Sequence, residues 1–161
     1  MSRTVRIMAI FFIALFISGC NKNKVYEEHK TNFPQFRWEK SNVVEFNPEI
    51  IDNDNNYEIV VALRHIFGFN LKSIKIDMEM IAPSGEKTVN EYLLSFYDDQ
   101  GDLLSTCAGD FCDMEQSLED DFKFNEVGEY KINIYHRMDI NPIPNIMEVG
   151  LIIEKIVPDQ E

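Results

Sequence analysis

The chain has 161 residues, and its 28 acidic against 15 basic side chains give a formal net charge of -13 at pH 7. A surface this acidic repels nucleic-acid phosphates, which argues against a DNA- or RNA-binding function. The length suits one domain, and 12 Phe and 6 Tyr residues are available to fill its core.

Residues 1–19 have the composition of a signal peptide. Arg3 and Arg6 make the start positive, residues 7–17 are apolar, and small residues follow them. A transmembrane helix needs about 20 apolar residues, so this stretch is too short to span a bilayer. It has the dimensions of the apolar part of a signal peptide, which predicts export from the reducing cytoplasm.

The signal peptide ends at a cysteine. Residues 17–20, Ile-Ser-Gly-Cys, resemble the bacterial lipobox, in which the cysteine is lipidated and becomes the new N-terminus after cleavage. We therefore predict that Cys20 carries a lipid anchor, because two or three acyl chains hold a protein at a membrane almost permanently. The alternative is an ordinary signal peptide that ends at an unrelated cysteine.

The next segment, residues 20–41, is polar with isolated aromatic residues and lacks a period of 2 or of 3.6. This pattern predicts a lipidated N-terminus and a tether that becomes ordered near Tyr26 or Trp38, ahead of the folded domain. Residues 42–161 are predicted to form the folded domain.

A hairpin is predicted over residues 73–97. Apolar and charged residues alternate from 74 to 80, which is typical of a strand with one buried face. Residues 83–85, Pro-Ser-Gly, then favour a turn before a second strand. Further strands are expected over 57–66 and 128–138.

The last strand is expected near the C-terminus, with Met147, Val149, Leu151 and Ile153 pointing inward. Only residues 113–122 are a candidate for a short helix. The spacing of the strands predicts a single antiparallel β-sandwich of seven or eight strands, all-β in class. Jelly-roll and immunoglobulin-like arrangements both remain open.

Cys107 and Cys112 are separated by four residues. In an oxidising compartment such a pair is first interpreted as a local disulfide, worth about 2 kcal/mol by loop entropy. Free thiols and a metal or redox site are the alternatives, although a redox site normally has two residues between its cysteines.

The sequence contains no catalytic motif, such as a nucleophile elbow, a phosphate-binding loop or a zinc-protease helix. No catalytic residue, metal ligand or cofactor is therefore predicted. Residues 52–56, Asp-Asn-Asp-Asn-Asn, resemble a calcium loop, but Tyr57 stands where an EF-hand requires glycine. A turn between strands is the favoured interpretation.

Residues 136–145 form a candidate contact surface, because two prolines stiffen a loop that follows a strand. For His136 itself, alternation favours an inward position with a hydrogen bond to a backbone carbonyl. Trp38, the single tryptophan, is expected to dock against the sandwich edge rather than stack on a sugar.

Several segments together resemble the GldH family of gliding-motility lipoproteins of the Bacteroidetes. These are residues 25–28 (Val-Tyr-Glu-Glu), Trp38, residues 83–87, residues 109–111 and the C-terminal block 127–155. The resemblance implies an envelope lipoprotein associated with gliding and with type IX secretion, and it implies no enzymatic activity.

The expected protein is thus a lipid-anchored, non-enzymatic β-sandwich that binds envelope proteins of the gliding and secretion apparatus. No small-molecule substrate is expected. Asn21 after the lipidated cysteine predicts the outer membrane, and the lack of an acidic cluster there predicts a periplasmic orientation. A glycan-binding surface lipoprotein is the alternative, and an esterase or glycosidase is the third hypothesis. Which surface binds the partner is not predicted.

Overall fold

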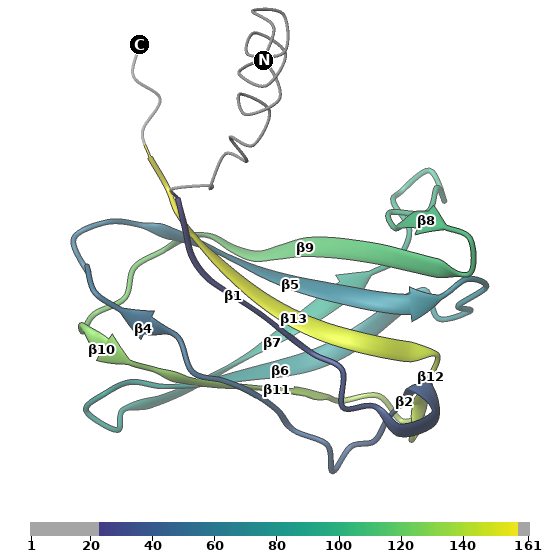
Figure 1. The fold of residues 1–161 in the computed structure, drawn as a ribbon, viewed down its shortest axis with the longest axis horizontal. Helices are drawn as coiled ribbons and strands as arrows, with labels where there is room; N and C mark the ends of the chain where they lie inside the picture. Colours follow the sequence, from purple (N-terminus) through teal and green to yellow (C-terminus); the bar gives the residue numbers. More distant parts are fainter. Residues whose placement is uncertain (1–22, 158–161) are drawn as a thin grey trace, which may run out of the picture.

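The computed structural model describes residues 23–157, and these residues form two antiparallel β-sheets packed face to face (Figure 1). The first sheet has the order β1-β13-β5-β9-β8, and the second has the order β3-β11-β6-β7. Two short pairs, β10-β4 and β12-β2, complete the structure. The elements in chain order are β1 (Lys24–Lys30), η1 (Pro34–Phe36), β2 (Arg37–Trp38), β3 (Val44–Phe46), β4 (Glu49–Ile50), β5 (Tyr57–Ile66), β6 (Ser73–Ile81), β7 (Lys87–Ser95), β8 (Thr106–Ala108), β9 (Phe111–Phe122), β10 (Gly128–Glu129), β11 (Lys131–His136), β12 (Ile143–Pro144) and β13 (Ile146–Lys155).

The predicted all-β sandwich is confirmed, with more strands than the seven or eight expected. Most of the additional strands have only two or three residues. They lie in polar segments rich in turn-forming residues, so the sequence does not identify them. The two-residue strands pair with one another at the ends of the sandwich as two separate two-stranded sheets, and they are too short to show a recognisable alternation.

The hairpin predicted over 73–97 is also confirmed. Strands β6 and β7 pair without a register shift from Ser73 opposite Ser95 to Ile81 opposite Lys87. The turn is closed by the Ala82 amide, which donates to the Glu86 carbonyl at 2.8 Å. Gly85 adopts a φ of +90°, a conformation that favours glycine.

A single apolar core fills the space between the sheets. Alternation turns one face of each long strand inward, as it does for Ile59, Val61 and Leu63 of β5. Strands β13 and β5 lie in the middle of the first sheet and contribute much of this core. In β13, Val149, Leu151 and Ile153 point inward as predicted.

The prediction for Met147 is wrong. A register shift between Ile146 and Glu148 inserts an extra residue into β13, so the core position passes to Ile146 and Met147 is only partly buried. Residues 113–122 are not helical either, because they belong to β9, which pairs along β5 through two register shifts. These irregularities break the alternation that would have identified the strand.

The tether predicted over 20–41 is too long: β1 begins at Lys24, close to the earlier of the two expected positions, and it pairs antiparallel with β13. This edge strand is held by hydrogen bonds between backbone groups, which any sequence can form. Its side chains are mostly polar and at most partly buried, so no pattern of apolar residues predicts the strand. Phe33 and Trp38 then enter the core, with exposed fractions of 5% and 0%. The predicted signal peptide 1–19 and the lipidated Cys20 lie outside the described residues.

Candidate interaction site

The outer face of the second sheet carries a mixture of charged and apolar side chains. Along β6, Lys75, Asp77 and Glu79 point outward by the same alternation that turns their neighbours inward. The register places Asp77 opposite Glu91 of β7 on one side and opposite Tyr135 of β11 on the other. Both charges and aromatic surface therefore meet at the centre of this face.

A hollow of about 440 Å³ opens beside Asp77. Strands β6 and β7 contribute most of its lining, and Arg137, the residue after β11, contributes the rest. Arg137 is held there because its amide donates to the Lys75 carbonyl at 2.7 Å, which continues the ladder between β11 and β6. The lining consists of Lys75, Ile76, Asp77, Glu91, Tyr92, Leu93 and Arg137.

The carboxylate of Asp77 is buried, with only 5% of the side chain exposed. Its Oδ2 lies 3.3 Å from Nη1 of Arg137, whereas its Oδ1 has no hydrogen-bond partner among residues 23–157. Burying a carboxylate is costly unless both oxygens are paired. Asp77 is thus an acceptor that a donor group of a ligand could satisfy if the exposed Arg137 side chain moved aside.

Two further hollows adjoin the first and share a residue with it. One, of about 430 Å³, shares Arg137 and also meets Lys40 and Asp139. The other, of about 590 Å³, shares Leu93 and extends to the turn at residues 97–101. We call the three together the transverse groove, because they cross β11, β6 and β7 in the half of the second sheet that runs from Lys72 to Asp77.

Only some residues of the candidate contact surface 136–145 line this groove. Arg137 and Asp139 line it, but Ile143 is fully buried. The segment is held by β12, which pairs with β2, and by the Lys40 amide, which donates to Asn141 Oδ1 at 2.8 Å. A cis peptide bond precedes Pro142. The loop is therefore an integral part of the fold.

His136 points inward as predicted, with 2% of its surface exposed. The expected hydrogen bond to a carbonyl is absent: the ring lies beside the Trp38 backbone, but neither ring nitrogen has a partner of normal geometry in the described chain. Burial lowers the pKa of His136 below its ordinary value, which favours the neutral ring. Its edge packs on Trp38, with ring centroids 5.4 Å apart.

The docking predicted for Trp38 is confirmed. The indole is fully buried, it meets Phe33 in an edge-to-face contact, and its Nε1 donates to the Asn42 carbonyl at 3.0 Å. A ring in this position cannot form a platform for a sugar.

A disulfide joins Cys107 of β8 to Cys112 of β9, which lie directly opposite one another with Cα atoms 4.0 Å apart. Cys112 is fully buried, and it lies opposite His65 on the neighbouring strand β5. The bond therefore fixes the short strand β8 to the edge of the first sheet.

A serine and a histidine come together next to this disulfide. His65 Nε2 lies 2.8 Å from Ser105 Oγ, and His65 Nδ1 lies 3.1 Å from the Ile66 carbonyl oxygen. A hydrolase would need a carboxylate or similar group at Nδ1 and an open path to the hydroxyl. Both side chains are buried and neither lines a hollow described here, so the pair supports packing.

The Asp-Asn segment at 52–56 forms a turn. Asp52 Oδ1 accepts a hydrogen bond from the Asp54 amide at 2.9 Å, and Oδ2 lies 3.0 Å from Nζ of Lys155. These bonds, led by the amide, hold the pKa of Asp52 below its ordinary value. Within residues 23–157, no group of three or more His, Cys, Asp or Glu side chains is placed to hold a metal ion.

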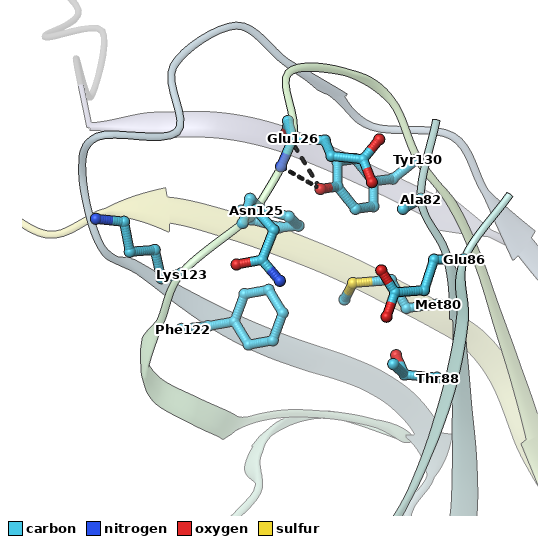
Figure 2. A pocket seen from close by; sticks show the side chains of 10 residues that line it. Met80, Ala82, Glu86, Thr88, Phe122, Lys123, Asn125, Glu126 and Tyr130 are labelled. Atoms are coloured by element: carbon cyan, nitrogen blue, oxygen red, sulfur yellow. Dashed lines mark hydrogen bonds between the residues drawn. The ribbon is translucent and has the colours of Figure 1, made fainter. Parts of the chain in front are cut away.

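A smaller cavity of about 70 Å³ lies between the two sheets at the end near the β6-β7 turn (Figure 2). Met80 and Thr88 from the second sheet face Phe122 across it, and Tyr130 accepts a hydrogen bond from the Glu126 amide at 3.0 Å. It has room for about two water molecules, at roughly 30 Å³ each, and not for a larger ligand.

Sequence reasoning did not find the groove. In the sequence, Asp77 had the appearance of an ordinary outward residue of a strand. The groove depends on which strands are neighbours, because Asp77, Leu93 and Arg137 are far apart in the chain. A single sequence does not reveal that a charged residue on the outer face of a strand is buried by its neighbours.

The fold and the described surface define an antiparallel β-sandwich with an open groove across one sheet. Among residues 23–157 there is no helix long and apolar enough to cross a membrane. The family described as GldH lipoprotein matches residues 24–153, so the chain belongs to the GldH lipoprotein family. The resemblance seen in the sequence is confirmed.

A protein of Christiangramia forsetii, described as a gliding motility lipoprotein GldH homolog, is 27% identical over 153 residues, which cover 91% of this chain and 92% of that protein. A solved structure of TmCBM61 in complex with β-1,4-galactotriose covers 82% of both chains at 13% identity. Its TM-score is 0.33. The chain is therefore placed among membrane-anchored lipoproteins of the gliding-motility type.

Proposed function

We propose that this protein is a lipid-anchored, non-enzymatic module that supports gliding motility and type IX secretion by binding other envelope proteins. Membership in the GldH lipoprotein family is the observation that carries the proposal. Cys20 supplies the anchor, the outer membrane is the location, and the folded domain faces the periplasm. β1 begins within a few residues of Cys20, so the domain is held close to the lipid surface.

The transverse groove is the surface that binds the partner. Its charges of both signs, Lys75, Asp77, Glu91 and Arg137, favour recognition of a protein surface over that of a uniformly charged polymer. A donor group of the partner would be stabilised here by a hydrogen bond to the unpaired Oδ1 of Asp77.

The non-enzymatic role is supported by the burial of the His65–Ser105 pair, which opens onto none of the hollows described above for residues 23–157. The glycan-binding alternative is weakened by the burial of Trp38, which removes the only tryptophan from the surface.

Photo-crosslinking in intact cells tests this proposal. A crosslinking residue replaces Lys75 in the groove or, as the control, Glu115 on the outer face of the first sheet; both are exposed strand positions. We expect Lys75 to capture defined envelope proteins, and we expect Arg137→Glu to abolish that capture. Equal capture from both positions, or capture of glycans without protein, would overturn the proposal.

A further inference from the structure

Strand β7 forms one edge of the second sheet, because β6 is its only neighbour among residues 23–157. Residues 87–91 of this strand are all exposed, including Thr88 and Asn90, which alternation turns toward the inner side of the sheet. The cavity in Figure 2 reaches Thr88, so the first sheet leaves this corner uncovered. An exposed edge of this length offers backbone groups to another strand.

The hydrogen bonds of Gln116 show which backbone groups of β7 point away from β6. Its side chain accepts a hydrogen bond from the Ser95 amide at 2.8 Å and donates to the Leu93 carbonyl at 3.0 Å, on the side away from β6. Because groups alternate along a strand, the amides and carbonyls of Lys87, Val89 and Glu91 also point away from β6. Gln116 occupies the end of the edge and leaves this part open.

We propose that the edge of β7 pairs with the same edge of a second copy of this chain, antiparallel and centred on Val89. A two-fold axis at Val89 places Lys87 opposite Glu91 of the second copy, and Glu91 opposite Lys87. All of these residues point their backbone groups toward the new partner, so each pair can exchange both hydrogen bonds.

The side chains of these pairs are complementary. The opposite charges of Lys87 and Glu91 meet on the outer face at both ends of the ladder, and cross-strand pairs of opposite charge are stabilising. Val89, which is 46% exposed, meets its own copy between them. Lys87 already contacts Glu79 of β6, so it lies on the face where the second copy's Glu91 arrives.

The order of charged residues along β7 favours a second copy of this chain over an unrelated strand as the partner. Lysine on an edge normally discourages pairing, because it brings like charges together. Here the order Lys-Thr-Val-Asn-Glu is self-complementary about its centre, so antiparallel pairing with an identical edge neutralises both charges at once. The pairing joins two four-stranded sheets into one continuous sheet.

Disulfide trapping of the full chain in its native envelope tests the pairing. A hydrogen-bonded antiparallel pair brings Cα atoms to about 5.5 Å, within the range of a disulfide, so Val89→Cys will form a covalent dimer. Leu93→Cys is the matched control: it is on the same strand and face, and it is 49% exposed. Its two copies would lie about 26 Å apart and will not join.

Charge variants in the Val89→Cys background make the test specific. Lys87→Glu and Glu91→Lys should each lower the yield of trapped dimer about tenfold, and the double exchange should restore it. Sedimentation of the same charge variants without the added cysteine gives a second measurement that does not depend on trapping.

Equal trapping at positions 89 and 93, or insensitivity to the charge exchange, would overturn the proposal. A covalent product with a different protein, without the homodimer, would assign the edge to another partner's strand and would also overturn it. Because Glu91 also lines the transverse groove, such a product is compared with the proteins captured from Lys75.

Discussion

The imidazole of His29 lies directly over Gly150. A Cβ atom at Gly150 would come within 2.6 Å of His29 Nδ1 and within 3.2 Å of the Ala62 Cβ. His29 stays there because its Nδ1 lies 2.8 Å from Oε1 of Glu148. This contact between β1 and β13 shows that the chain is part of the sandwich well before residue 42.

Gly150→Ala therefore tests the packing of β1. The added methyl group must displace the His29 ring, so we expect the free energy of unfolding to fall by about 1 kcal/mol. In a His29→Ala background the cost should be smaller, because the nearest atoms are gone and alanine is otherwise preferred in a strand. Urea unfolding of all four proteins checks this, and an equal cost in both backgrounds would contradict it.

Trp38→Ala tests whether the segment before residue 42 stabilises the domain. The indole is fully buried, so its removal should cost about 3–5 kcal/mol. Trp38 is also the only tryptophan, and its fluorescence should shift to longer wavelength as the domain unfolds. A tether would predict no loss of stability and an emission maximum that does not change on unfolding.

The sequence predicted the elements whose alternation is regular. The hairpin of β6 and β7 pairs without a shift, so its pattern of apolar and charged residues identifies it directly. Strand β9 was missed because two register shifts interrupt its pattern, and β1 was missed because a polar edge strand is held by its backbone. The groove could not be predicted, since it depends on strand order.

The two buried histidines make stability depend on pH. Burial lowers the pKa of both His136 and His65 below 6.5, so the unfolded chain binds more protons than the folded one in the range just below that value. The free energy of unfolding should therefore fall as the pH drops from 7 to about 5. The carboxylates whose pKa is lowered, such as Asp113 beside Arg64, contribute at lower pH, near their ordinary value of 3.8.

His136→Phe isolates one of these groups. Neither ring nitrogen makes a hydrogen bond of normal geometry, although the ring contacts the Trp38 backbone, so we expect a change in unfolding free energy of less than about 1 kcal/mol at pH 7 and a smaller dependence on pH. His65→Phe is the control, because it leaves the buried Ser105 hydroxyl without its hydrogen-bond partner. We expect it to lower the free energy of unfolding by about 1–3 kcal/mol. An unchanged pH dependence in His136→Phe would contradict the assignment.

The disulfide should add a modest amount to stability. The loop it closes is short, so replacing both Cys107 and Cys112 by serine should lower the free energy of unfolding by about 2 kcal/mol, and a reducing agent should have the same effect on the natural chain. Unfolding curves with and without reductant measure this. If reductant left the natural chain unchanged, the bond would have no stabilising role.

The central claim is that the folded domain acts only when it is held at the membrane by Cys20. The direct measurement compares gliding of cells that lack the protein with cells that express the natural chain or Cys20→Ala at the same level. We predict that Cys20→Ala yields a folded domain that is released from the membrane and fails to restore gliding. Full restoration of gliding by Cys20→Ala would contradict the account.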